Sequence, residues 1–381
     1  MKTSIAFLGV VASLVLAGRQ AQAVTVLDDK EHDRSLSVGI LLQPQLTFTQ
    51  DGAPPPAPTG HNLSTDFFLR RVRMYTAGQI TKGLTFFLQI DQPNLGQNGN
   101  FVPSGTTSAF FRDAVVSYEF AREFSIDGGL ILFPFTHNSL EGAGSLHTVD
   151  YRPAPALNYP GNEGRIFSDV GVQLRGLLFD DRLHYRVGAF EGARAGSSTP
   201  PNPLINESGI PRFTGMLRFN ILGVEDKFYF QGVYFAEKPL VSIGVGGDFQ
   251  PHAETAPTGI SDYAAANADV FVEYPLTGDD EIIANAAVAD WRVGKNSPGT
   301  GVSVFGEAGY RHAWIEPLIA MDWFKADDNL RDYVDIRPGL NFWLRKHNGN
   351  IKAEAVWSSN WTPAEQHVRS FQVVVQGQVF F

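Results

Sequence analysis

Apolar and polar side chains alternate along most of this chain. After Gly83, large apolar residues take every second position, and the positions between them are mostly polar: Leu84, Phe86, Leu88 and Ile90 alternate with Thr85, Phe87, Gln89 and Asp91. Residues 212–221 repeat the pattern, with Arg, Thr, Met, Arg and Asn on one face and Phe, Gly, Leu, Phe and Ile on the other. Successive side chains of a β-strand point to opposite faces, so these stretches predict strands with one apolar and one polar face.

Comparable stretches continue to the last residue without a domain boundary or a sustained helical period. The candidate strands are residues 36–49, 67–80, 84–91, 112–120, 125–133, 169–177, 183–190, 212–221, 228–235, 240–249, 263–274, 282–292, 302–311, 314–325, 333–344, 351–358 and 369–381. An odd number of spans cannot leave both chain ends on one side of a membrane. Either one stretch between Lys227 and Phe249 is not an independent span, or one span was missed, so we predict about 16 strands, with 18 as the alternative.

The connections between these strands alternate in length. Residues 81–83, 121–123, 179–182 and 275–281 are short connections, whereas residues 51–64, 93–108, 136–165 and 194–210 are long and rich in Pro, Gly, Asn and Ser. Short turns at one end and long loops at the other are typical of a transmembrane antiparallel β-barrel. The fold class predicted from the sequence is therefore all-β.

The first residues indicate export from the cytoplasm. Lys2 precedes an apolar run from Ser4 to Ala17, and Ala21-Gln22-Ala23 fits a cleavage site, so residues 1–23 are predicted to be a Sec-type signal peptide. Residues 24–381 would then form the barrel domain. No later stretch has the roughly 18 uninterrupted apolar residues of a transmembrane helix, and the absence of Cys excludes disulfides and thiol chemistry.

Composition and charge narrow the function further. The net charge of −10 disfavours a nucleic-acid partner, which would need a basic face. The nine His residues are scattered, and neither G-x-S-x-G nor H-E-x-x-H occurs, so no enzyme activity, cofactor or metal site is predicted. The high counts of Phe (29) and Gly (38) suit a barrel with aromatic girdles and closely packed strands.

A membrane barrel of this size implies a water-filled interior. Only a closed sheet satisfies its backbone hydrogen bonds in lipid, and with about 16 strands the wall side chains cannot fill it. The apolar faces would then contact lipid and the polar faces would line the lumen. The predicted pore-lining residues are Arg71, Arg73, Asp91, Asp113, Asp169, Arg175, Arg186, Arg212, Arg218 and Arg337. The arginines could form a ladder that attracts anions, or the carboxylates could pair with them and leave a weakly selective wall.

Residues 136–165 form a loop that is too long to lack structure unless it is functional or disordered. Its polar residues are candidates for a constriction if the loop folds into the lumen: His137, Asn138, Glu141, Asp150, Arg152 and Arg165. Alternatively, the loop would pack over the mouth of the barrel.

Several motifs occur in the order found in one porin family. They are residues 67–73, Gly78, Lys82-Gly83 and residues 86–91; then Asp113–Tyr118, Gly128-Gly129 and Phe133-Pro134-Phe135; then Asp169–Gln173 and Tyr185–Gly192. In this order they resemble the phosphate-selective porin O/P family over the first half of the chain. The second half is similar only in the regular succession of strands and connections. The resemblance implies a trimeric channel for small solutes in the bacterial outer membrane, in contact with lipid and lipopolysaccharide.

The long loop departs from that family. Phosphate-selective members line their constriction with Lys and Arg, whereas this loop has no Lys and only two Arg. The sequence therefore predicts a passive porin for small hydrophilic solutes or ions with at most a mild preference for anions such as phosphate. The alternatives are an occluded barrel with a structural or adhesive role and a secreted soluble β-protein.

Overall fold

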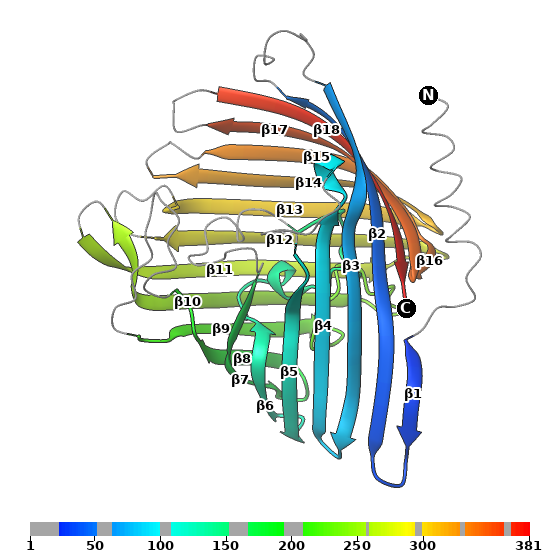
Figure 1. Ribbon diagram of the computed structural model, residues 1–381, viewed down its shortest axis with the longest axis vertical. Coiled ribbons are helices and arrows are strands. Elements are labelled where there is room, and N and C mark those ends of the chain that lie inside the picture. Colours follow the sequence, from blue (N-terminus) through cyan, green and yellow to red (C-terminus); the bar gives the residue numbers. More distant parts are fainter. Residues whose placement is uncertain are drawn as a thin grey trace.

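The computed structural model of the chain is an all-β structure (Figure 1). It describes residues 23–51, 63–99, 108–151, 167–193, 209–256, 259–293, 299–327, 332–361 and 367–381. The strands are β1 (Val24–Asp29), β2 (Arg34–Asp51), β3 (Leu63–Thr81), β4 (Leu84–Leu95), β5 (Phe110–Ala121), β6 (Phe124–Leu132), β7 (Ser168–Leu178), β8 (Leu183–Phe190), β9 (Arg212–Leu222), β10 (Leu240–Ala256), β11 (Gly259–Pro275), β12 (Asp280–Arg292), β13 (Gly301–His312), β14 (Ile315–Ala326), β15 (Tyr333–Phe342), β16 (Leu344–His347), β17 (Gly349–Trp361) and β18 (His367–Phe380). Two short 3-10 helices, η1 (Gln97–Gly99) and η3 (Asn138–Leu140), complete the described elements. Within these ranges, no helix has the length and apolar character needed to cross a bilayer.

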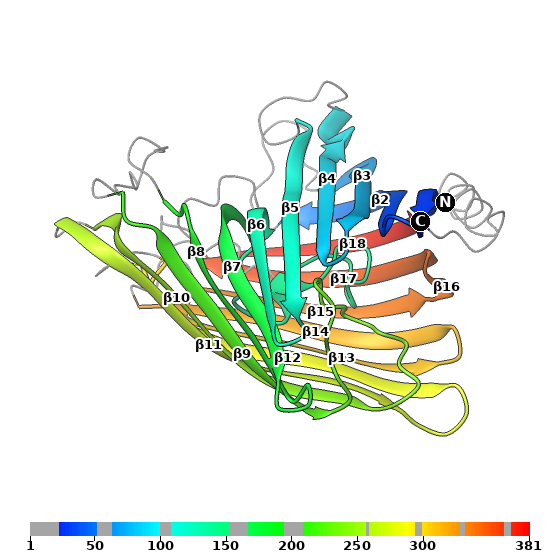
Figure 2. The ribbon, with the colours of Figure 1, turned by 90° about the horizontal axis from the view of Figure 1, so that it is seen from below.

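Sixteen strands, β2 to β15 together with β17 and β18, close into one antiparallel barrel. The ring closes where β18 pairs with β2, and the last residue completes this seam because Ile40 and Phe381 exchange two backbone hydrogen bonds of 2.6 and 3.0 Å. The walls formed by β3 to β5 and by β11 to β13 lie opposite each other (Figures 1 and 2). The predicted fold class and the count of 16 are confirmed.

The two faces of the sheet differ as the alternation predicts. On β9, the side chains of Leu217 and Phe219 are 47% and 46% exposed on the outer surface, whereas Arg218 between them is 0% exposed and faces the interior. The same contrast holds on β14, where Ile319 is 55% exposed and Asp322 is fully buried. A surface of aliphatic and aromatic side chains around a closed sheet is what hydrocarbon accommodates.

The candidate strand at residues 228–235 is wrong. Residues 223–239, here called the inner turn, join β9 to β10 without a strand of their own, although the other connections at this end are short, as between β13 and β14. The alternation of aromatic residues in this segment imitates a strand, but the inner turn folds into the barrel, where Phe230 and Val233 are completely buried. Removing this candidate from the count explains why sixteen strands, and not seventeen, form the wall.

A second segment enters the barrel from the opposite end. Residues 133–151, here called the inner loop, are the described first part of the connection between β6 and β7. The inner loop meets the inner turn through reciprocal backbone hydrogen bonds: Phe230 donates to Leu140 over 2.9 Å, and Gly142 donates to Phe230 over 3.0 Å. Apolar side chains of both segments, including Phe135, Leu146 and Phe230, form one buried cluster with the wall. The interior is therefore partly filled by protein.

Candidate functional site

The structure turns all ten predicted pore-lining residues towards the interior and gives most of their charges a partner. The ion pairs are Arg71–Asp150, Arg73–Asp91, Arg175–Asp127, Arg212–Asp248, Arg218–Asp269 and Arg337–Asp335. Asp169 accepts a hydrogen bond of 2.7 Å from the backbone of Gly192. Carboxylates at this spacing neutralise the arginines, so the arrangement is a set of ion pairs and not a bare cationic ladder.

Three of the predicted residues are covered by the inner segments. Arg186 donates to the backbone oxygen of Lys227 over 2.9 Å and lies against the ring of Phe230. The guanidinium of Arg212 lies 4.0 Å from the ring centre of Phe133, and that of Arg218 lies 5.3 Å from Phe230. These side chains are 0–1% exposed, and they hold the inner segments by cation–π contacts and hydrogen bonds.

Irregularities in β3 and β5 place consecutive charged residues on the inner face. Between β2 and β3 the register shifts by one residue, so that Arg70 has no partner in β2 and joins Arg71 in binding Asp150. Between β4 and β5 the shift leaves Arg112 without a partner in β4. Arg112 and Asp113 are both buried on the inner side, because the extra residue of a β-bulge turns a side chain that alternation would place outside.

The inner loop is attached to strands around much of the wall. Lys352 of β17 donates to the backbone oxygens of Leu146 and Thr148, and the backbone of Val149 donates to Glu354 over 2.6 Å. On β3, three strands along the ring from β17, Arg70 and Arg71 hold the carboxylate of Asp150. Two other predicted loop residues, Arg152 and Arg165, lie outside the described residues.

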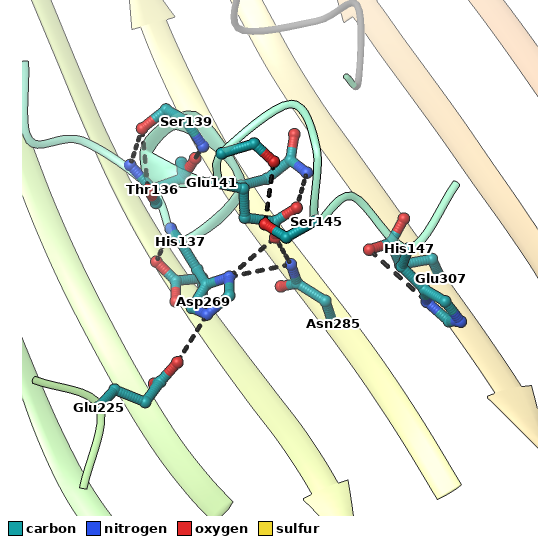
Figure 3. Close-up of polar contacts among 12 residues, drawn as sticks. Thr136, His137, Ser139, Glu141, Ser145, His147, Glu225, Asp269, Asn285 and Glu307 are labelled. Carbon is teal, nitrogen blue, oxygen red and sulfur yellow. Dashed lines mark hydrogen bonds and ion pairs between the residues drawn. The ribbon is translucent and has the colours of Figure 1, made fainter. Parts of the chain in front are cut away.

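His137 joins the inner loop to the inner turn and the wall (Figure 3). Its ring nitrogens lie 2.9 Å from Glu141 and 2.8 Å from Glu225, and its ring stacks between Phe230 and Phe271. Burial lowers the pKa of His137, but the two carboxylates more than offset this effect and raise the pKa to about 9. At neutral pH, His137 is therefore a buried imidazolium between two carboxylates.

His147 attaches the other end of the inner loop. Its Nε2 lies 2.7 Å from Glu316 of β14, and Glu307 of β13 is the second carboxylate nearby. Burial again lowers the pKa, and the carboxylates of Glu316 and Glu307 raise it to about 9. Gly309 leaves the space for this contact, because a Cβ at that position would lie 2.7 Å from Nε2 of His147.

The raised pKa values of His137 and His147 predict how the stability of the barrel depends on pH. Their pKa in the folded chain, about 9, lies above the ordinary value of 6.5, so their stabilising effect is complete below pH 6.5 and is lost as the pH rises through 9. The thermal unfolding temperature of the barrel in detergent should therefore fall between about pH 6 and pH 10. A variant with both His137→Gln and His147→Gln should be less stable at pH 6 and should lose less on alkalinisation. An equal loss in both proteins would contradict the role of the histidines.

A cavity of about 180 Å³ lies between the inner loop, the inner turn and the wall of β2 to β5. Apolar and aromatic side chains supply much of its lining: Leu41, Tyr75, Phe87, Tyr151, Tyr229 and Phe380. Arg73, Gln89, Arg112 and Asp113 add polar groups. The cavity thus combines an apolar wall with a few convergent charges, which is the composition of a small-molecule site.

Sequence reasoning missed three contributors to this interior. Arg112 was missed because period-two alternation puts it on the face opposite to Asp113. Only the register shift between β4 and β5 turns its side chain to the inner face. Phe230 was missed because residues 228–235 imitate a strand, and Glu225 was missed because it lies just before that stretch. The sequence signals that could have found them are the excess of one candidate strand and the Glu237-Lys238-Pro239 junction directly before β10.

Comparison with solved structures agrees with this architecture. The outer membrane channel DcaP of Acinetobacter baumannii is 12% identical to the chain, with a TM-score of 0.60 over 94% of this chain and 100% of that one. Pseudomonas putida OprB is 9% identical, with a TM-score of 0.62 over 91% of this chain and 94% of that one. An anion-selective porin from Comamonas acidovorans is 10% identical, with a TM-score of 0.56 over 91% of this chain and 99% of that one.

Comparison by sequence finds no such likeness. The sequence matches no protein-family model and no curated protein. The solved structures therefore establish the fold, which is that of outer-membrane porin channels.

Proposed function

We propose that this protein is a passive diffusion channel of the bacterial outer membrane for small hydrophilic solutes or ions. The observation that carries the proposal is a closed barrel of 16 strands with lipid-compatible residues outside and charged residues inside. The side chains of such a wall cannot fill its interior. Export through the signal peptide at residues 1–23, which lie almost wholly outside the described residues, would deliver the chain to that membrane.

The inner loop and the inner turn together narrow the conduit in this proposal. Both occupy the interior, and the cavity beside Arg73 and Tyr75 marks the space that they leave next to the wall of β2 to β5. The ordered motifs that resemble the phosphate-selective porin O/P family support a homotrimer surrounded by outer-membrane lipid and lipopolysaccharide. The paired arginines support weak selectivity with at most a mild preference for anions.

An occluded barrel is the second candidate, because two segments and a buried apolar cluster fill part of the lumen. Single-channel recording in planar bilayers separates the two functions. A passive channel gives stepwise currents at low voltage from purified, folded protein. An occluded barrel gives none, although it inserts into the bilayer.

Ion preference should respond to the pair formed by Arg73 and Asp91. The Nε of Arg73 lies 2.8 Å from the Asp91 carboxylate, and both side chains are at most 7% exposed. Arg73→Gln leaves a negative charge beside the conduit and should shift the reversal potential in a salt gradient towards cations, whereas Asp91→Asn should shift it towards anions. Asp181→Asn, at an exposed turn, is the control and should shift nothing. If neither lumenal variant moves the reversal potential, this pair has no part in permeation.

A further inference from the structure

Two oppositely charged side chains face the 180 Å³ cavity from the bulge in β5. Arg112 is 5% exposed, and within the described residues its guanidinium donates a hydrogen bond to the hydroxyl of Ser168. Asp113 is 2% exposed, and in the described part of the chain its Oδ1 has no hydrogen-bond partner. The Tyr229 hydroxyl lies close to the Asp113 carboxylate. Buried polar groups with unused hydrogen-bonding capacity are costly unless a ligand or water completes them.

We propose that this cavity binds a small zwitterion, in which a carboxylate and an ammonium group lie next to an apolar ring or chain, as in an apolar α-amino acid. This inference rests on the proposed channel function and names the solute class that the channel would favour. Arg112 would hold the carboxylate and Asp113 the ammonium group.

The chemistry of the two side chains fits these roles. A guanidinium presents several N–H donors in a planar fork, and a single serine hydroxyl leaves the others for a carboxylate. The Asp113 carboxylate offers an acceptor for the three N–H groups of an ammonium ion. The two charges sit on consecutive residues of the bulge and line the same cavity, so one small solute can contact both.

The same pair disfavours solutes with a single charge. An anion drawn to Arg112 is placed beside the negative charge of Asp113, and a cation drawn to Asp113 is placed beside Arg112. Specificity of this kind comes from repulsion of the wrong solute as much as from attraction of the right one. Arg73 also lines the cavity, and its own ion pair is with Asp91.

The apolar lining limits the size and the character of the rest of the solute. Phe87, Tyr75 and Phe380 line the cavity, and their rings form connected contacts, with ring centres 6.2 Å apart for Tyr75 and Phe87 and 5.7 Å apart for Tyr75 and Phe380. A dry cavity of about 150 Å³ is large enough to hold benzene. A volume of about 180 Å³ therefore suits one six-membered ring or a branched aliphatic chain with a compact charged end.

The test uses three probes that share a phenyl ring and differ in charge: phenylalanine, 3-phenylpropionate and 2-phenylethylamine. Purified full-length protein in planar bilayers is titrated with each probe, and block of the KCl current gives its dissociation constant. Isothermal titration calorimetry on the same protein in detergent gives the affinity independently of conduction. Phenylalanine should bind the wild-type protein about tenfold more tightly than either singly charged probe, which is the effect of one additional charge-assisted contact.

Two variants should change this order in opposite directions. Asp113→Asn should make 3-phenylpropionate the tightest probe, and Arg112→Gln should make 2-phenylethylamine the tightest. Asp335→Asn, at a lumenal ion pair away from the cavity, is the matched control and should leave the order unchanged.

The inference is overturned if phenylalanine binds no more tightly than 3-phenylpropionate to the wild-type protein, or if both variants keep the wild-type order in calorimetry. A wild-type protein that conducts no KCl but still prefers phenylalanine in calorimetry would refute the channel and leave the binding site standing. Conduction of KCl without any preference for phenylalanine would refute the binding site and leave the channel standing.

Discussion

Replacing residues 223–240 with Asn-Gly should raise the single-channel conductance about twofold or more, because the inner turn occupies part of the cross-section of a barrel whose wall cannot fill it. The replacement is compatible with the barrel because Leu222 already pairs with Val241, so a two-residue hairpin turn closes β9 onto β10. It also removes Glu225 and Phe230, which hold His137 of the inner loop from one side. The inner loop should then move more freely, and the open-channel current should become noisier.

Conductance of the replacement variant is compared with that of the wild-type protein and of Phe230→Ala in planar bilayers. Phe230→Ala keeps the inner turn and removes only its central contact, so its conductance should lie between the other two. Resistance of the folded barrel to SDS before heating establishes that the wall is closed in each protein. An unchanged conductance in the replacement variant would show that the inner turn does not limit the current.

Asp248→Asn should destabilise the barrel by about 3–5 kcal/mol, the usual cost of removing one member of a buried ion pair. The side chains of Arg212 and Asp248 are 0% and 1% exposed, and the Tyr263 hydroxyl donates to the same carboxylate over 3.1 Å. The substitution removes the negative charge that faces the guanidinium of Arg212, which stays buried against Phe133.

An exposed pair of the same chemistry supplies the control. Arg122 and Asp181 form a salt bridge of 2.6 Å in the short turns, with side chains 51% and 28% exposed. Asp181→Asn should cost at most about 1 kcal/mol because solvent screens this pair. Urea unfolding of each variant in detergent, followed by tryptophan fluorescence, gives both free energies. Equal costs at the two sites would mean that the interior around Arg212 is as wet as the surface.

The barrel could be predicted from the sequence because its strands obey a two-residue period that depends on local side chains alone. Residues 212–221 are an example: the predicted faces of Leu217 and Arg218 are those observed. The inner turn could not be predicted in this way. Its alternating aromatic residues satisfy the same period, and only the parity of the strand count and the Glu237-Lys238-Pro239 junction distinguish it from a span.

The candidate site was less predictable because its partners come from distant strands. His137 and Glu141 were expected in a constriction loop, but nothing local indicates that Glu225 completes their contact. Arg112 depends on a register shift between β4 and β5, which arises from the pairing of two strands and not from either strand alone. Alternation assigns faces correctly only where the ladder is regular.

Nitroxide scanning along β4 in lipid bilayers tests most directly which face of the barrel meets lipid. The natural chain has no Cys, so single cysteines introduced at residues 84–91 carry the label uniquely. Accessibility to oxygen, which concentrates in the bilayer, should peak at Leu84, Phe86, Leu88 and Ile90 and fall at Phe87, Gln89 and Asp91. Oxygen accessibility without a two-residue period, or with its peaks at Gln89 and Asp91, would contradict a lipid-facing apolar surface and with it the channel.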